Sequence, residues 1–195
     1  MTSHARALGG REPAERRLTA EHEITRALVE ASTFAEAVPK ILEAICQALD
    51  WAHGAFWTID RQLNALTCAQ VWTADAGNFP EFPSASQHAI FSRGVGLPGR
   101  VWETGEPAWI PDVVRDTNFP RAPVAGREGL HGAFGFPILL RGDVVSVMEF
   151  FSREIREPKV FGSGNPAVHM VRNSSTSIRS RNSRSRGTRN GSGSR

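Results

Sequence analysis

Hydrophobic residues near the start of the chain recur with the period of an α-helix. The i, i+3, i+4, i+7 spacing predicts an amphipathic helix over residues 15–32, whose apolar stripe is formed by Ile24, Ala27, Leu28 and Ala31. Thr33 and Glu36 then have the spacing of a capping box, which predicts the start of a second helix over residues 34–51. Pro39 lies inside this second helix, and we expect it to kink or restart the first turns.

Apolar runs in the rest of the chain predict β-strands. Residues 52–60 and 65–75 are expected to form an antiparallel pair, because only a short polar link joins them. Residues 132–140 and 144–152 form the clearest hairpin, and both arms are nearly all apolar. We therefore expect this hairpin to lie centrally in a sheet whose two faces are both covered. The pattern predicts an α+β domain, with helices on one face of an antiparallel sheet and irregular segments on the other.

The irregular part, residues 76–131, contains most of the Gly and Pro punctuation of the folded region. We expect a short helix at residues 84–92, a short strand starting at residue 108 and a helical turn between residues 115 and 130. Within "GLPGRVWETGEPAWIPDV", a short helix is predicted to end at Gly105 in a left-handed C-cap. Trp102 should point inward from this helix and Trp109 should open the next strand, so the two indoles need not meet.

Charge divides the chain into two parts. Residues 1–157 contain 15 basic and all 20 acidic residues, whereas residues 158–195 contain eight basic residues and no acidic ones, which gives a net charge of +3. From Arg172 onward the chain is mainly Arg and Ser, so it cannot bury enough apolar surface to offset the entropy lost on ordering. We expect a disordered N-terminus at residues 1–14, a folded domain at residues 15–158 and a disordered tail at residues 159–195.

The lengths of the apolar runs and the spacing of the cysteines indicate the cellular compartment. No apolar run approaches the roughly 20 residues that a membrane-spanning helix needs, so we expect no membrane association. The two cysteines, Cys46 and Cys68, have no CxxC spacing and no nearby histidine cluster. That argues against a structural metal site or a secreted disulfide framework, and it favours the cytoplasm.

Five short motifs carry a family resemblance, in the order "GLPGRVW", "WIPDV", "NFPRA", "AFGFPI" and "VMEFFS". Residues 15–158 resemble the GAF domain, in the form found in bacterial sensor histidine kinases and related signalling proteins. The resemblance implies a central antiparallel sheet of five or six strands, with helices on one face and ligand-binding loops on the other. It also implies a sensory module that binds an unidentified small molecule and forms at most a weak homodimer through its N-terminal helix.

The resemblance also suggests residues for the pocket wall. The aromatic candidates that the resemblance implies are Trp72, Phe91, Trp102, Phe119 and Phe134. Glu149 stands in an apolar strand, where an unpaired carboxylate would be costly, so we expect it to pair with an arginine or a backbone donor. No cofactor can be named from the sequence. After residue 158 the chain departs from the family pattern, and we expect a truncated or frameshifted sensor that lacks its output domain.

Two other functions compete with the sensory one. Some GAF-fold proteins are free methionine sulfoxide reductases, which need closely placed cysteines on the pocket loops, and neither cysteine lies within residues 76–131. The basic tail could bind nucleic acid through phosphates, but it has no aromatic residue to stack on bases. His88 and His131 could in principle ligate haem iron, although a lone histidine usually has a structural role. We therefore expect neither catalysis nor specific nucleic-acid binding.

Overall fold

Within residues 4–75 and 79–156, which the computed structural model describes, the chain forms one six-stranded sheet. The strand order is β3-β2-β1-β6-β5-β4 and every neighbouring pair is antiparallel. The strands are β1 (His53–Asp60), β2 (Ala65–Thr73), β3 (Ile90–Phe91), β4 (Ala108–Ile110), β5 (Ala133–Leu140) and β6 (Asp143–Phe151). The predicted α+β architecture is confirmed, and β6 of the clearest hairpin lies between β1 and β5 near the centre of the sheet.

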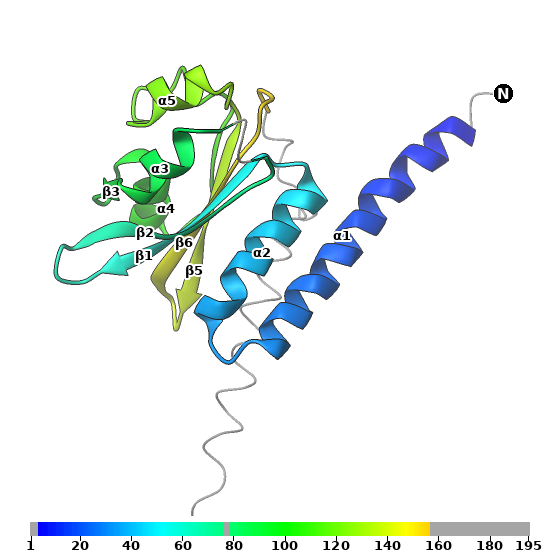
Figure 1. The fold of residues 1–195 in the computed structure, drawn as a ribbon, viewed down its shortest axis with the longest axis horizontal. Coiled ribbons are helices and arrows are strands. Elements are labelled where there is room, and N and C mark those ends of the chain that lie inside the picture. Colours follow the sequence, from blue (N-terminus) through cyan, green and yellow to red (C-terminus); the bar gives the residue numbers. More distant parts are fainter. Residues whose placement is uncertain (1–3, 76–78, 157–195) are drawn as a thin grey trace, which may run out of the picture.

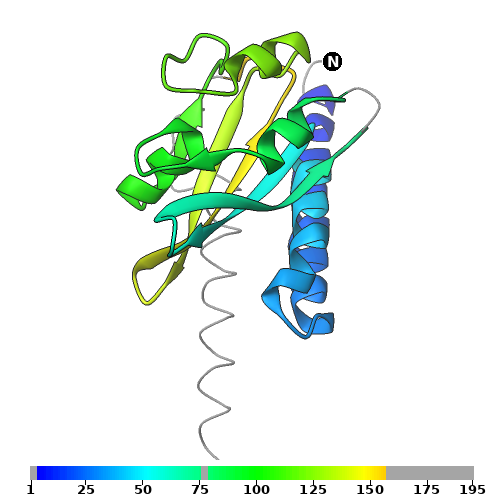
Figure 2. The same cartoon turned by 60° about the vertical axis from the view of Figure 1, so that its left-hand side comes forward.

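Helices cover the two faces of the sheet unequally. The long helices α1 (His4–Glu30) and α2 (Phe34–Leu49) lie on one side, which we call the helix face (Figure 1). The other side, which we call the loop face, is covered by irregular segments and the short helices α3 (Phe82–Gln87), α4 (Gly96–Thr104) and α5 (Ala122–Arg127). Figure 2 shows the same separation from another side. The sheet thus separates a regular helical layer from a layer built of loops.

Helix α1 begins at His4, well before residue 15. The backbone of residues 4–14, where we expected a disordered N-terminus, continues this helix. Once a helix is nucleated, each added residue gains a hydrogen bond at little further cost, so a packed C-terminal half can extend toward the N-terminus. Figure 1 shows this end of α1 extending past α2. No helix of the described part of the chain is both long and apolar enough to cross a membrane.

Helix α2 begins as the capping pattern predicts. The Thr33 hydroxyl accepts from the Glu36 backbone N–H at 3.3 Å, and the Glu36 carboxylate accepts in return from the backbone N–H of Ser32 at 2.9 Å. A restart at Pro39 is wrong, because α2 continues through this residue. Pro39 removes only the hydrogen bond to the carbonyl of Ala35, which lies on an exposed turn where water can replace the lost donor.

The segment around the two tryptophans matches its prediction. Helix α4 has its C-cap at Gly105, where φ is 68°. Trp102, a residue of this helix, buries its side chain in the hydrophobic cluster of the loop face. Trp109 packs on the helix face, with its ring centroid 5.5 Å from that of Trp51 and 5.4 Å from that of Phe134. The indoles therefore lie on opposite faces of the sheet. The predicted helix at residues 84–92 is shorter, because strand β3 occupies its last part.

Replacing Gly99 with Ala is expected to lower the free energy of unfolding by about 2–3 kcal/mol. A Cβ at this position would lie 2.3 Å from the backbone oxygen of Ser92, and backbone atoms cannot turn aside as a flexible side chain can. Urea unfolding measures the effect. Gly126→Ala is the matched control, since its Cβ would meet Val114 at an ordinary 3.4 Å, and it should leave stability unchanged or slightly increased. Equal stability of the two variants would contradict the packing described for α4.

Candidate functional site

Strand alternation places a charged residue at the centre of the loop face. On β6, Met148 and Phe150 belong to the hydrophobic cluster of the helix face, whereas Val147 and Phe151 belong to that of the loop face. Because successive side chains of a strand point to opposite faces, Glu149 points to the loop face between Val147 and Phe151. Its side chain is fully buried. A carboxylate in the middle of an apolar sheet face needs a specific partner.

The partner is Arg121, which reaches the sheet from the loop that precedes α5. Its Nη2 atom lies 2.7 Å from Oε1 and 2.8 Å from Oε2 of Glu149. Its Nη1 atom donates to the hydroxyl of Ser86 on α3 at 2.8 Å. The Arg121 side chain is only 5% exposed, so the ion pair is shielded from water. The prediction that Glu149 pairs with an arginine or a backbone donor is confirmed.

Aromatic rings surround the guanidinium of Arg121. Five ring centroids lie 5.1–5.3 Å from its Cζ atom, and they belong to Trp57, Phe82, Phe91, Phe119 and Phe151. Each distance falls within the range of a cation–π contact. The rings come from β1, α3, β3, the loop before α5 and β6, so this one side chain contacts five separate segments of the chain. We call these rings and Glu149 the cage.

The loop that carries Arg121 is tied to α4 by polar contacts. The amide of Asn118 accepts from the backbone N–H of Gly96 at 3.1 Å and donates to the carbonyl of Gly94 at 2.8 Å. Arg100 on α4 binds the carboxylate of Asp116, which holds the pKa of that carboxyl below its usual range. These contacts hold the loop against the loop face of the sheet, where Phe119 contributes a ring to the cage and Arg121 reaches Glu149.

The short helices of the loop face are joined in a similar way. The carboxylate of Glu128, just after α5, accepts from the backbone N–H groups of Glu81 and Phe82 at 2.6 and 3.1 Å. Arg127 also pairs with the side chain of Glu81. Phe82 and Ser86 of α3 both contact the guanidinium of Arg121, so this junction holds one wall of the cage in place.

Burial and charge set the protonation of the site. Burial raises the pKa of Glu149, and the adjoining Arg121 opposes that shift. His53, a fully buried neighbour whose ring packs on Phe82 and Phe151, has its pKa lowered from 6.5 to about 3, first by burial and then by Arg121. Its Nδ1 atom is 2.9 Å from the hydroxyl of Thr73. His53 is therefore neutral at physiological pH.

Four buried polar atoms at the site have no hydrogen bond of ordinary geometry among the described residues. They are Nε of Arg121, Nε2 of His53, the indole nitrogen of Trp57 and Oε1 of Glu149. Oε1 still lies 2.7 Å from Nη2 of Arg121, and the indole of Trp57 favours the charged form of Glu149. Buried polar atoms are usually paired, and an unpaired one costs about 1–3 kcal/mol. The site thus offers unused hydrogen-bonding capacity beside the ion pair.

Stability is expected to fall as the pH is lowered from 6.5, because His53 stays neutral in the folded protein down to a pKa of about 3. Below pH 6.5 the histidine of the unfolded chain binds a proton, whereas His53 in the folded chain does not. This one group therefore lowers the free energy of unfolding by up to about 1.4 kcal/mol for each pH unit. Urea unfolding at about pH 7 and about pH 5 measures the slope for wild type and His53→Asn. A variant as steep as wild type would contradict the assignment.

The five aromatic residues predicted for the pocket wall do not share one site. Phe91, Trp102 and Phe119 belong to the loop-face cluster, and Phe91 and Phe119 are part of the cage. Trp72 and Phe134 pack against the helix-face cluster instead. The reason is alternation: Val71 and Ala133 face the loops, so the next residue on each strand points the other way. The five residues therefore do not line one pocket in this structure, and a ligand-binding role for each of them stays a prediction.

The cysteines and histidines considered for catalysis or haem are far from a common centre. Cys46 is buried on the helix face and Cys68 packs on the loop face, so the sheet separates their thiols. Burial raises the pKa of Cys46, and burial together with Glu149 raises that of Cys68 to about 12. His88 bonds to the Ser84 carbonyl and His131 to Asp112. Among the described residues, no group of three or more His, Cys, Asp or Glu could hold a metal ion.

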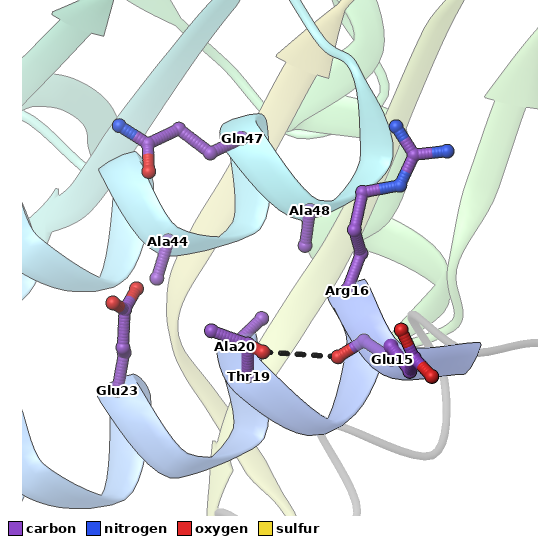
Figure 3. A pocket seen from close by; sticks show the side chains of 8 residues that line it. All are labelled: Glu15, Arg16, Thr19, Ala20, Glu23, Ala44, Gln47 and Ala48. Atoms are coloured by element: carbon purple, nitrogen blue, oxygen red, sulfur yellow. Dashed lines mark hydrogen bonds between the residues drawn. The ribbon is translucent and has the colours of Figure 1, made fainter. Parts of the chain in front are cut away.

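A groove of about 280 Å³ lies elsewhere, between α1 and α2 (Figure 3). Small side chains such as Ala20, Ala44 and Ala48 form its floor, while the long side chains of Arg16 and Glu23 stand at its sides. No unpaired buried polar atom points into this groove among the described residues, in contrast to the cage. We therefore take the cage as the candidate site and the groove as a place for control substitutions.

Comparison with known proteins identifies the fold family. The GAF domain family model matches residues 31–167, well over half of the chain. The chain belongs to the GAF domain family. GAF domains are typically regulatory modules that bind small molecules. No curated protein matches the sequence.

Solved structures with the same fold come from several functional settings. One is the GAF domain of a phosphoenolpyruvate-protein phosphotransferase from Coxiella burnetii, with 18% identity and a TM-score of 0.66 over 88% of this chain and 98% of that one. Another is the GAF domain of A. aeolicus nlh2 in an inactive state, with 22% identity and a TM-score of 0.59 over 85% of this chain and 90% of that one. A third is free methionine-R-sulfoxide reductase from Neisseria meningitidis with its substrate, with 13% identity and a TM-score of 0.64 over 87% of this chain and 89% of that one. At these identities the likeness shows the fold.

Proposed function

We propose that this GAF domain is a non-enzymatic sensory module of a bacterial, cytoplasmic signalling protein such as a sensor histidine kinase. Its small-molecule site is the loop face around Arg121 and Glu149. The observation that carries the proposal is the buried ion pair itself, which sits beside unpaired nitrogen atoms of Arg121 and His53. Stability alone does not account for such a pair, because an apolar replacement of similar volume is often as stable. A binding function explains why they are present.

The thiols support a sensory function over a reductase function. Thiolates, not thiols, are the reactive form of cysteine, and burial raises the pKa of both cysteines here. The sheet also separates Cys46 from Cys68, so they are not placed for a common reaction. Glu149 of the cage and the neighbouring His53 serve as binding groups: Glu149 is paired with Arg121 and His53 is held neutral.

Strand β6 offers a path from the site to the helices. Glu149 faces the loop face, while its neighbours Met148 and Phe150 pack in the cluster that contains α1 and α2. A ligand that shifts Glu149 would therefore move side chains that contact the helical layer. Packed interfaces change between discrete arrangements, so a small displacement of this strand can alter how the helices sit on the sheet. The helices are the elements that would carry the signal to an output domain.

A thermal-shift screen tests the proposal. The wild-type protein is tested with cyclic nucleotides, haem, tetrapyrroles, amino acids and organic amines. Each compound that raises the melting temperature is then tested on two variants. Arg121→Met/Glu149→Leu removes the charges of the cage at similar volume, whereas Arg16→Met/Glu23→Gln changes the groove between α1 and α2.

We expect a stabilising compound to lose its effect in the cage variant and to keep it in the groove variant, because ligand binding to the folded state raises the melting temperature only where the site is intact. A compound that stabilises the cage variant as much as wild type would contradict the proposed site. A compound that loses its effect only in the groove variant would move the site to the helix face.

A further inference from the structure

The cage has the chemistry of a receptor for an organic cation. Aromatic faces attract a positive charge, and a buried carboxylate completes the charge balance that such a cation needs. In this structure the cation is the guanidinium of Arg121, held by five rings and by both oxygens of Glu149. The guanidinium of Arg121 therefore occupies a site that could accept a guanidinium from a separate molecule.

The walls of the cage are held by contacts that do not involve Arg121. Trp57, Phe151 and Glu149 lie on the paired central strands β1 and β6. Phe82 is fixed by its backbone N–H, which donates to the carboxylate of Glu128, and the loop that bears Phe119 is fixed through Asn118 and Arg100. Removing the Arg121 side chain is therefore expected to leave a shaped cavity with a carboxylate on its wall.

Arg121 is an imperfect occupant of the cage. Nη1 donates to Ser86 and Nη2 to Glu149, but Nε has no partner among the described residues. Nε2 of the neutral His53 is likewise unpaired. A chain-tethered guanidinium cannot move to satisfy every group, because its backbone is fixed before α5, where its carbonyl accepts from Val124 and Ala125. A free cation has no such tether.

We propose that the cage binds small organic cations that carry a guanidinium or ammonium group, and that Arg121 is a resident occupant which such a cation displaces. The proposal rests on the proposed function, because it names the ligand class and the competitor at that same site. An internal competitor weakens binding, because only molecules in which it has left the site can bind the ligand. The apparent affinity equals the intrinsic affinity multiplied by the fraction of such molecules. A tethered group acts at an effective concentration that can reach the millimolar range, so free cations must compete with it.

The variant Arg121→Ala tests the proposal, with N-ethylguanidinium as the probe. This molecule corresponds to the part of the arginine side chain that the substitution removes, and N-ethylurea is its neutral counterpart of similar shape. Binding is measured by calorimetric titration and by melting temperature, with sodium chloride matching the ionic strength. We expect N-ethylguanidinium to bind Arg121→Ala and to raise its melting temperature, and N-ethylurea to do neither.

Three further proteins locate the binding. Arg121→Ala/Glu149→Gln retains the cavity but lacks the carboxylate, so it should lose the response to N-ethylguanidinium. Arg93→Ala, which removes a different guanidinium that lies 4.5 Å from the ring centroid of Trp102, should bind as wild type does. Wild type should bind the probe at least about tenfold more weakly than Arg121→Ala, because its own arginine competes.

If Arg121→Ala does not fold alone, the same titration is followed by circular dichroism, and recovery of the native spectrum with N-ethylguanidinium but not with N-ethylurea supports the proposal. Failure of the probe to bind or to restore folding overturns it. Equal affinity for wild type and Arg121→Ala, or a retained response in the Glu149→Gln double variant, also overturns it. Screening hits of another chemical class that depend on the cage would leave the proposed function intact while this inference fails.

Discussion

Replacing Glu149 with Ala is expected to lower the free energy of unfolding by about 3–5 kcal/mol, because it leaves the guanidinium of Arg121 buried without a counter-charge. The side chains of the pair are 5% and 0% exposed, so the guanidinium left behind is shielded from bulk solvent. The five surrounding rings attract the cation but cannot neutralise it. Urea unfolding monitored by tryptophan fluorescence gives the loss directly.

The double variant Arg121→Met/Glu149→Leu separates charge from packing. Both replacements are apolar and of similar volume, so the cost of an unpaired buried charge disappears. We expect this variant to be considerably closer to wild type in stability than Glu149→Ala. A double variant that is as unstable as the single one would show that the side-chain shapes matter, and that the ion pair as such does not.

Replacing Trp102 with Ala is expected to lower the free energy of unfolding by about 3–5 kcal/mol, since its indole is 3% exposed within the loop-face cluster. The guanidinium of Arg93 covers its ring at 4.5 Å, and that contact is lost as well. Trp109→Ala should cost less, because Trp109 is only partly buried at the edge of the helix face. Urea unfolding of the two variants measures both losses.

The same pair of variants tests how the two faces differ in function. Trp102 lies in the cluster that contains the cage, whereas Trp109 packs on Trp51 and Phe134 on the other side of the sheet. We expect Trp102→Ala to change the affinity for a stabilising compound and Trp109→Ala to leave it unchanged. An affinity that falls with Trp109→Ala and stays constant with Trp102→Ala would contradict the assignment of the site to the loop face.

Local patterns predicted those parts of the fold that depend on neighbours in sequence. The capping box at Thr33, the left-handed C-cap at Gly105 and the apolar hairpin all occur where the sequence predicts them. Strand β3 was missed, because its two residues pair with β2 over only a short stretch and carry no periodic signal. The early start of α1 was missed because propagation of a helix leaves no apolar pattern.

The candidate site was predictable only in part. The cost of an unpaired carboxylate correctly implied a partner for Glu149. The identity of that partner depends on how the loop before α5 folds back over the sheet, and 28 residues separate Arg121 from Glu149. The signal that could have found it was the arginine within "NFPRA", which follows an aromatic residue and a proline. Trp72 and Phe134 lie on the helix face, apart from the other three candidates, because one residue of strand register decides the side.

The most direct test of the loop-face site uses the five tryptophans as reporters. Trp57 and Trp102 belong to the loop-face cluster, while Trp51, Trp72 and Trp109 belong to or pack against the helix-face cluster. Proton–nitrogen correlation spectra of the indole groups are recorded with and without the compound that most raises the melting temperature, and Trp57→Phe and Trp102→Phe assign the signals. The account predicts that the signals of Trp57 and Trp102 shift most. Shifts confined to Trp51, Trp72 and Trp109 would contradict it.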